Sequence, residues 1–230
     1  MNYQPTIAVI IPAFNEEQSI GKVINAISTQ LVQRIIVVNN GSTDNTVEVA
    51  ESAGAIVLTE NRKGYGWACL AGIDFLRNDP PEIVVFLDGD FSDFPEEIPV
   101  VIQPILKEEM DMVIGSRVLG KREKGSLMPQ QIAGNWLATR LIKLFYGASF
   151  TDLGPFRAVK FDKLLALEMS DKTYGWTIEM QLKAAKKKYR FCEVPVNYKK
   201  RIGVSKVSGT IKGTLLAGIK IIFAVFKYRF

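Results

Sequence analysis

The stretch that decides the fold is IIVVNNGSTDNTVEVA, residues 35–50. Four apolar residues run directly into two asparagines and a series of small polar residues, and a helix-forming segment follows. A short continuous apolar run predicts a strand buried on both faces. Asn, Gly, Ser and Asp are the residues of turns and helix N-caps. The stretch therefore predicts a buried strand, a polar loop and a helix, which is the repeating unit of an α/β fold.

The same unit recurs through the first half of the chain. Apolar runs predict strands at 7–11, 35–38, 55–58, 83–87 and 112–114, with helices at 17–30, 44–53, 66–77 and 95–109 between or after them. This alternation predicts a mainly parallel central sheet with helices on both faces. The second half predicts helices at 129–146, 161–169 and 176–188, a strand within 189–198 and an amphipathic C-terminal helix. We expect one domain over residues 1–210, followed by that helix at 211–230.

Composition excludes several kinds of chemistry. The 230 residues include no histidine, which removes His-based triads, His general bases and His-ligated zinc sites. Cys69 and Cys192 lie far apart, which favours buried thiols in a reducing compartment. The net charge of +5 permits phosphate-bearing or anionic lipid ligands. We expect no nucleic-acid partner, because no motif of that kind is present. We expect the first apolar run to be a strand, not a signal peptide, and no membrane span.

The strand ends carry the chemistry. Ligands of open α/β sheets bind beyond the carboxyl ends of the strands. Any one polar loop is explained by turn formation, but five consecutive polar strand ends predict a ligand crevice. These ends read PAFNEE (12–17), NNGSTD (39–44), ENRKG (60–64), DGDFSD (88–93) and GSR (115–117).

The sharpest local feature is Asp88-Gly89-Asp90. Carboxylates two residues apart on an extended chain project to the same side, and they repel unless a cation lies between them or one is protonated. Gly89 leaves room for a ligand to approach the backbone. Mg²⁺ is usually held by one or two carboxylates, with water and phosphate as the other ligands. The motif predicts a divalent metal site, and an acidic turn is the alternative.

Two basic residues follow other strands. Lys63 lies in a glycine-containing loop before a helix, where a phosphate is readily bound. Arg117 follows the fifth strand and is placed to reach the same diphosphate, or else to remain a solvated surface arginine.

The order of these motifs resembles a known family. PAFNEE, NNGSTD, DGD and GSR, at these spacings, resemble the nucleotide-sugar half of family 2 glycosyltransferases of the GT-A fold. TDLGPFRAV, YGWTIE, EVPVNY and RIGVSK resemble the polyprenol-phosphate sugar transferases, of the dolichyl-phosphate mannose or glucose synthase type. The resemblance covers nearly the whole chain.

The resemblance implies a role for individual residues. In the nucleoside pocket it places Pro12, Phe14 and Glu16, with Val38 and Asn40 flanking the base. At the diphosphate it places Asp88 and Asp90 with Mg²⁺ or Mn²⁺, and Arg117, Arg201 and Lys206 on phosphates of donor or acceptor. Glu179 is a candidate for the sugar hydroxyls, or a solvent-facing helical glutamate. Relatives commonly carry aspartate where this chain has Asn40. The amide can still accept a hydrogen bond, so we expect Asn40 to contact the base.

The resulting functional hypothesis is a metal-dependent inverting glycosyltransferase that moves a hexose from a UDP- or GDP-linked donor to a polyprenyl phosphate. An ionised phosphate acceptor needs no general base, which suits a chain without histidine. An alcohol acceptor would need one, and Asp152 and Glu179 are the candidates. The alternatives are transfer to a glycan or small hydroxyl compound, and non-catalytic binding of a nucleotide sugar. A sugar-nucleotide pyrophosphorylase is disfavoured, because PAFNEE is not a glycine-rich loop.

A lipid acceptor requires access to a bilayer. The segment KKRIGVSK (199–206) is basic, and each such charge contributes about 1 kcal/mol near anionic lipid. Helix 211–230 combines Lys212, Lys220, Lys227 and Arg229 with Leu, Ile and Phe, a composition that suits the membrane interface. We expect a cytoplasmic protein bound peripherally to the inner face of the membrane. The alternative is a C-terminal helix packed on the domain.

Overall fold

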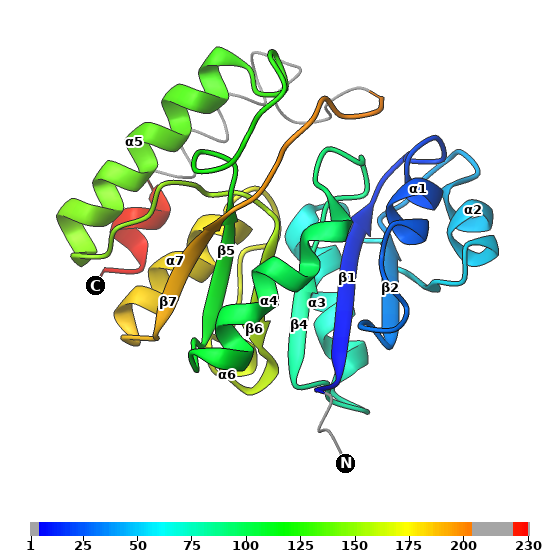
Figure 1. Cartoon of the computed structure of the whole chain (residues 1–230), viewed down its shortest axis with the longest axis horizontal. Helices are drawn as coiled ribbons and strands as arrows, with labels where there is room; N and C mark the ends of the chain where they lie inside the picture. The colour runs from blue at the N-terminus through cyan, green and yellow to red at the C-terminus, as the bar shows by residue number, and fades with distance from the viewer. Residues whose placement is uncertain (1–4, 204–222, 230) are drawn as a thin grey trace.

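A computed structural model describes residues 5–203 and 223–229 (Figure 1). The described strands form one seven-stranded sheet in the order β3-β2-β1-β4-β6-β5-β7. The strands are β1 (Ile7–Ala13), β2 (Arg34–Asn39), β3 (Ile56–Thr59), β4 (Ile83–Phe86), β5 (Met112–Ser116), β6 (Arg157–Lys160) and β7 (Phe191–Pro195).

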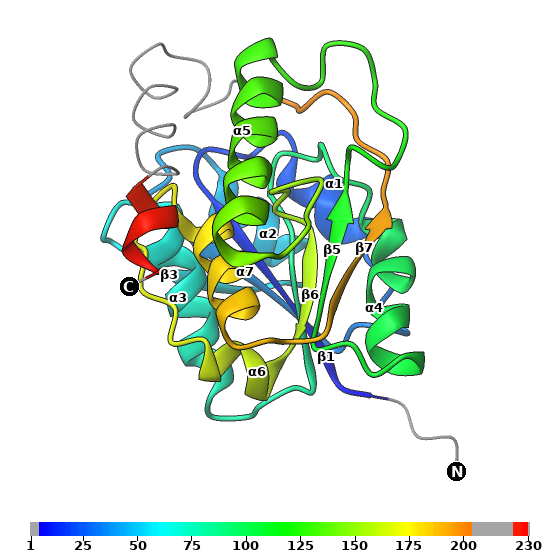
Figure 2. The same ribbon diagram turned by 90° about the vertical axis from the view of Figure 1, so that its left-hand side faces the viewer.

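The sheet is mostly parallel, as predicted. β1 pairs in parallel with β2 and β4, β2 with β3, and β5 with β7. Among the described strands, only β6 runs the other way, between β4 and β5. The carboxyl ends of the parallel strands therefore meet at one edge, which is uppermost in Figure 2. Strand β6 was not predicted, because its four residues, RAVK, include two basic side chains and lack a long apolar run.

Helices cover both faces of the sheet (Figures 1 and 2). Adjacent strand residues point to opposite faces, so Val37 and Val38 belong to two separate hydrophobic clusters. The Val38 cluster includes residues of α3, α5, α6 and α7, and the Val37 cluster includes residues of α1, α2 and α4. The helices are α1 (Ile20–Asn25), α2 (Thr46–Ser52), α3 (Tyr65–Leu76), the 3-10 turn η1 (Pro95–Glu97), α4 (Ile98–Lys107), α5 (Pro129–Tyr146), α6 (Phe161–Ala166) and α7 (Trp176–Lys186).

One predicted helix is much shorter than expected. The helix predicted at 17–30 is observed only as α1. The backbone N–H of Glu16 donates to the Oγ1 of Thr46 at 2.8 Å, and that of Glu17 to the Oδ2 of Asp44 at 3.2 Å. These donors are used by the neighbouring loop, so residues 16 and 17 belong to the strand-end region. Helix α5, by contrast, has the predicted limits.

Most of the predicted C-terminal helix lies outside the described residues, but its end is described. Residues 223–227 are helical and pack on the domain. The hydroxyl of Tyr146 donates to the carbonyl of Val225 at 2.7 Å, and the rings of Phe145 and Phe226 lie 5.1 Å apart. Within residues 5–203 and 223–229, no helix has the length and apolar character needed to cross a bilayer.

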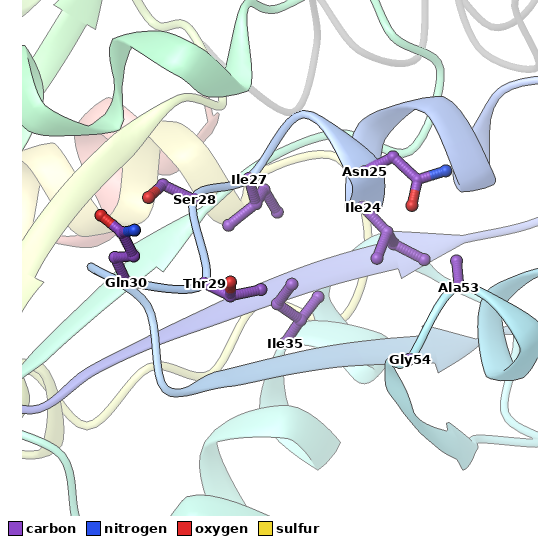
Figure 3. A pocket seen from close by; sticks show the side chains of 9 residues that line it. All are labelled: Ile24, Asn25, Ile27, Ser28, Thr29, Gln30, Ile35, Ala53 and Gly54. Atoms are coloured by element: carbon purple, nitrogen blue, oxygen red, sulfur yellow. The ribbon is translucent and has the colours of Figure 1, made fainter.

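A surface pocket of about 530 Å³ lies away from the predicted crevice (Figure 3). It is bounded by the end of α1, the start of β2 and the end of α2, so it is at the amino end of the parallel strands. Its lining residues are Ile24, Asn25, Ile27, Ser28, Thr29, Gln30, Ile35, Ala53 and Gly54.

Candidate active site

The loops after β1 and β2 are fastened together by small polar side chains. The Oδ1 of Asn15 accepts the backbone N–H of Thr43 at 2.8 Å, and the N–H of Asn15 donates to the Oγ of Ser42 at 3.0 Å. The Oδ1 of Asn39 accepts the N–H of Ser42 at 2.9 Å. The polarity of the stretch 39–46 therefore has a structural cause, since its side chains hold the loops after β1 and β2 together.

Asn40 fastens a third loop, the one after β3. Its Nδ2 donates to the carbonyls of Glu60 at 2.9 Å and Arg62 at 2.8 Å. Its Oδ1 accepts the N–H of Gly64 at 2.7 Å. The side chain of Lys63, on the same loop, is exposed. The carboxamide predicted to contact the base is thus bound to the backbone of residues 60–64.

The other residues expected at the nucleoside differ in exposure. Pro12 and Phe14, at the end of β1, are half-buried. Val38 is fully buried in the core, so its side chain is closed to a ligand. Gly89 is buried, and a Cβ there would lie 3.4 Å from the carbonyl oxygen of Pro12 and 3.5 Å from the Cγ of Glu16. These are ordinary van der Waals distances, so Gly89 faces the end of β1 across a gap about one methyl group wide.

The acidic residues after β4 have unused hydrogen-bonding capacity. The Oδ1 of Asp88 and both carboxyl oxygens of Asp93 are buried without a hydrogen-bond partner among the described residues. Burial raises the pKa of Asp88 to about 7, and the charge of Asp90 adds to the rise. The Oδ1 of Asp90 is occupied, since it accepts the N–H of Ser92 at 2.9 Å and its Oγ at 2.5 Å.

These carboxylates fit a divalent cation that brings its own further ligands. The Oδ1 of Asp88 is unpartnered among the described residues, and the Oδ2 of Asp90 is paired only with Arg201 there. In the described part of the chain, no three acidic or cysteine side chains gather into a complete metal-binding group. Two carboxylates completed by diphosphate and water are the usual set for Mg²⁺.

Arg201 lies beside this acidic pair. Its Nη2 is 3.2 Å from the Oδ2 of Asp90 and 3.3 Å from the Oε1 of Glu16. Its Nε is buried without a partner among the described residues. The N–H of Ile202 donates to the carbonyl of Asp90 at 2.9 Å, which fixes the segment carrying Arg201. Arg201 thus lies beside Asp90 and Glu16, whereas Lys206 lies outside the described residues.

Arg117 is held by a different carboxylate. Its Nε and Nη2 donate to the two oxygens of Asp152 at 2.8 and 2.7 Å, and its backbone N–H donates to Asp152 as well. The side chains of Arg117 and Asp152 are only 13% and 1% exposed. Burial opposes ionisation of Asp152, but the charge and hydrogen bonds of Arg117 outweigh it and lower the pKa. Arg117 is therefore neither a solvated surface residue nor free of a partner.

Glu179 is fully buried on α7, so a solvent-facing glutamate is the wrong alternative. Its Oε1 accepts the N–H of Ser170 at 2.9 Å, and its Oε2 accepts the N–H of Asp171 at 2.7 Å. Lys183 lies 2.8 Å away. Burial works against ionisation, but these partners lower the pKa of Glu179. Its carboxylate holds the loop that precedes α7.

Sequence reasoning gave no role to Arg157, which is completely buried on β6. Its Nη1 donates to the carbonyl of Thr177 at 2.9 Å, and its Nη2 donates to the carbonyls of Leu153 and Gly154. Burial lowers the pKa of Arg157 to about 10. The signal in the sequence was an arginine inside an otherwise apolar run, FRAV.

Comparisons with known proteins agree with this architecture. The profile of the family described as glycosyl transferase family 2 matches residues 8–166. A low-salt glycan biosynthesis hexosyltransferase of Haloferax volcanii is 32% identical over 86% of this chain, which spans 49% of that relative. The dolichyl-phosphate hexose transferase of the same organism is 32% identical, with 87% of this chain and 86% of the relative covered.

A solved structure shares the fold. Glucosyl-3-phosphoglycerate synthase from Mycobacterium tuberculosis, in complex with Mn²⁺, UDP and glucosyl-3-phosphoglycerate, superposes with a TM-score of 0.76. The match covers 97% of this chain and 80% of that one, at 23% identity. The family profile, the length of the matches to the relatives and the sheet order identify this chain as a glycosyltransferase of family 2 with the GT-A fold.

Proposed function

We propose that this glycosyltransferase moves a hexose from a UDP- or GDP-linked donor to a polyprenyl phosphate, with inversion at the anomeric carbon. The named activity of the dolichyl-phosphate hexose transferase supports this acceptor. The Mn²⁺ and UDP bound by the structural neighbour support a metal-dependent nucleotide-sugar donor.

The donor diphosphate binds at the edge formed by the loops after β1, β3 and β4. Asp88 and Asp90 would hold Mg²⁺ or Mn²⁺, which would supply positive charge to the leaving diphosphate. Arg201 adds positive charge beside Asp90, and Lys63 adds it from the loop after β3. Positive groups fixed before the reaction stabilise the charge that develops on the leaving group without reorganising. Arg117 contributes indirectly, because its hydrogen bonds to Asp152 fix the position of the loop that follows β5.

The observation that carries the choice of acceptor is the state of the two candidate bases. Asp152 and Glu179 are both buried, both bound by a cation, and both have a lowered pKa. Such carboxylates are poor acceptors for the proton of an alcohol. Asp93 is 2% exposed, and both of its carboxyl oxygens are buried. A phosphate acceptor is already ionised and needs none of these groups.

The outer face of α5 supports access to lipid. Trp136 and Leu144 are 60% and 73% exposed, and they lie on one side of the helix with Ile132 and Arg140. The cation of Arg140 lies over the Trp136 ring at 5.7 Å. Exposed tryptophan and leucine interleaved with basic residues suit a helix in the bilayer interface. We therefore extend the predicted membrane-facing surface from helix 211–230 to α5.

The division of the chain is part of the same proposal. Residues 1–210 form the catalytic domain and residues 211–230 the C-terminal helix. The end of that helix packs on α5 and α7, since Lys186 on α7 donates to the carbonyl of Tyr228 at 3.1 Å. The described residues 223–229 also contact the end of α5 through Phe145 and Tyr146. We propose that this segment and α5 face the membrane together.

A lipid-extraction assay tests the acceptor. The protein is incubated with Mn²⁺, labelled UDP-glucose or GDP-mannose, and either a short polyprenyl phosphate or 3-phosphoglycerate. We expect label in the organic phase with the lipid only. Label in a water-soluble product with 3-phosphoglycerate would instead support transfer to a small acceptor. Asp90→Asn removes transfer in either case, whereas Asp74→Asn, a matched change at an exposed aspartate on α3, leaves it intact.

Vesicle co-sedimentation tests the surface of α5. Trp136→Ser with Leu144→Ser is expected to weaken binding to vesicles containing anionic lipid by at least about tenfold, because two large apolar side chains no longer insert. Leu106→Ser, on the exposed side of α4, is the matched control. Equal loss of binding in both variants would place the membrane contact elsewhere.

A further inference from the structure

Three hydrogen bonds join the side chain of Asn40 to one loop, and they use both hydrogens of its Nδ2 and one acceptor position of its Oδ1. Both donor bonds of its Nδ2 go to backbone carbonyls of that loop, at Glu60 and Arg62, and its Oδ1 accepts the N–H of Gly64. All three distances lie between 2.7 and 2.9 Å. The carboxamide thus makes hydrogen bonds to the backbone of residues 60–64 that a neighbouring strand would make in a sheet.

The same loop is fixed from its other side. The carboxylate of Glu60 binds the Nη2 of Arg62 at 2.6 Å, and the guanidinium of Arg62 lies 3.6 Å above the Trp67 ring. Gly64 has φ +147°, and a Cβ there would lie 2.2 Å from the carbonyl oxygen of Lys172. The loop therefore has one well-defined shape, and its backbone cannot move toward the 171–172 segment.

From these contacts we propose that Asn40 is a positioning residue for the donor and does not read the base. It sets the shape of the loop 60–64, and that loop presents the exposed Lys63 to the donor diphosphate. The inference rests on the proposed nucleotide-sugar donor. It assigns base selection to groups other than the Asn40 amide.

In this chain the contacts suit an amide better than a carboxylate. Aspartate has the same shape and can accept the N–H of Gly64, but it cannot donate to the carbonyls of Glu60 and Arg62. Its charge would instead face two carbonyl oxygens at hydrogen-bonding distance. Asn40→Asp is therefore more harmful than Asn40→Ala. A residue that reads the base predicts the opposite order, because a charged acceptor strengthens a hydrogen bond from the base.

Calorimetric titration with UDP and with GDP, each in the presence of Mn²⁺, separates the two roles. We expect Asn40→Asp to weaken the binding of the preferred nucleotide by about tenfold and Asn40→Ala by less, because loop hydrogen bonds are lost or left unsatisfied. The ratio of UDP to GDP affinity stays the same. Asn61→Ala is the matched control, since it removes an exposed amide from the same loop.

A double-variant cycle tests whether Asn40 acts through Lys63. In a Lys63→Ala background, Asn40→Ala is expected to cost little additional affinity, because the loop no longer carries the cation to be positioned. Additive losses, a changed ratio of UDP to GDP affinity, or tighter binding by Asn40→Asp than by the wild type would overturn the proposal.

Hydrogen exchange keeps this inference separate from the proposed function. The amide of Gly64 is expected to exchange faster in Asn40→Asp than in the wild type without any nucleotide, because its acceptor group is repelled from the loop. If the wild type binds neither UDP nor GDP, the proposed donor is wrong and the donor-positioning role falls with it. Faster exchange would then still establish that Asn40 holds the loop 60–64. Unchanged exchange in a folded variant would disprove that Asn40 holds this loop.

Discussion

Two arginines near the same edge of the sheet are held in different ways. Arg117 makes two short hydrogen bonds to one carboxylate, Asp152, and both side chains are nearly buried. Arg201 is shared between Asp90 and Glu16 at 3.2 and 3.3 Å, is 30% exposed, and leaves its Nε without a partner among the described residues. The first arrangement is a finished structural pair. The second arrangement leaves one N–H donor of Arg201 unused among the described residues, and a ligand-binding site requires such unused donors.

The largest expected effect comes from breaking the finished pair. Asp152→Ala leaves the buried guanidinium of Arg117 unpaired, which costs about 3–5 kcal/mol of unfolding free energy. Urea denaturation measures it. Arg201→Ala is expected to cost less than about 1 kcal/mol, because its contacts are long and partly exposed.

A compensated variant provides the control for that prediction. Arg117→Met combined with Asp152→Leu removes both charges together, so it should recover much of the stability lost by Asp152→Ala. Equal stability losses for Asp152→Ala and Arg201→Ala would remove the distinction between the two arginines.

The second prediction compares Asp152, the partner of Arg117, with Asp88, which lies two residues before the Arg201 partner Asp90. Asp152 has a lowered pKa and stays ionised near neutral pH, whereas Asp88 has a pKa raised to about 7. Mn²⁺ requires ionised Asp88. Binding is therefore expected to be constant well above pH 7 and to weaken as the pH falls through 7, approaching about tenfold per pH unit. Titration of Mn²⁺ at pH 6, 7 and 8 measures this. Asp90→Glu keeps the negative charge next to Asp88, so Mn²⁺ binding in this variant should keep the same pH dependence. Mn²⁺ affinity that does not change between pH 6 and pH 8 in the wild type would contradict the prediction.

The third and smallest effect concerns Arg201 as a counter-charge. Arg201→Ala removes a cation from beside Asp90 and Glu16, so Mn²⁺ alone should bind about threefold to tenfold more tightly. In the same variant UDP with Mn²⁺ should bind more weakly, because a phosphate contact is lost. Electron paramagnetic resonance of free Mn²⁺ follows both. Lys200→Ala is the matched control, since Lys200 pairs with Glu123 instead. Loss of Mn²⁺ binding in Arg201→Ala would show a structural role.

Much of the fold was predictable from the sequence because its signals are local. The apolar runs located five strands, and the polar ends of the parallel strands lie at one edge of the sheet, where the ligand crevice is predicted. The antiparallel β6 escaped prediction, since a four-residue strand beginning with Arg157 has no periodic signal. Helix α1 was overestimated, because its predicted first turn is diverted into hydrogen bonds with residues 44 and 46.

The site was less predictable, because its side chains are defined by partners distant in sequence. The residues around Arg117 give no indication that Asp152, 35 residues later in the sequence, is its partner. Asn40 likewise finds its partners 20 to 24 residues later. The sequence indicates which residue types gather at the crevice, whereas the division between residues that bind ligand and residues that hold the walls needs three dimensions.

The close approach of Gly64 and Gly66 to the 171–172 segment has a consequence for engineering. A Cβ at Gly66 would lie 2.0 Å from the carbonyl oxygen of Asp171, and Glu179 in turn holds the N–H of Asp171. The loop 60–64 with the start of α3, and the segment 171–172 before α7, therefore fit closely against each other. A donor site grafted from a relative would have to bring both segments, and homologues that replace either glycine should show a compensating change at residues 171–172.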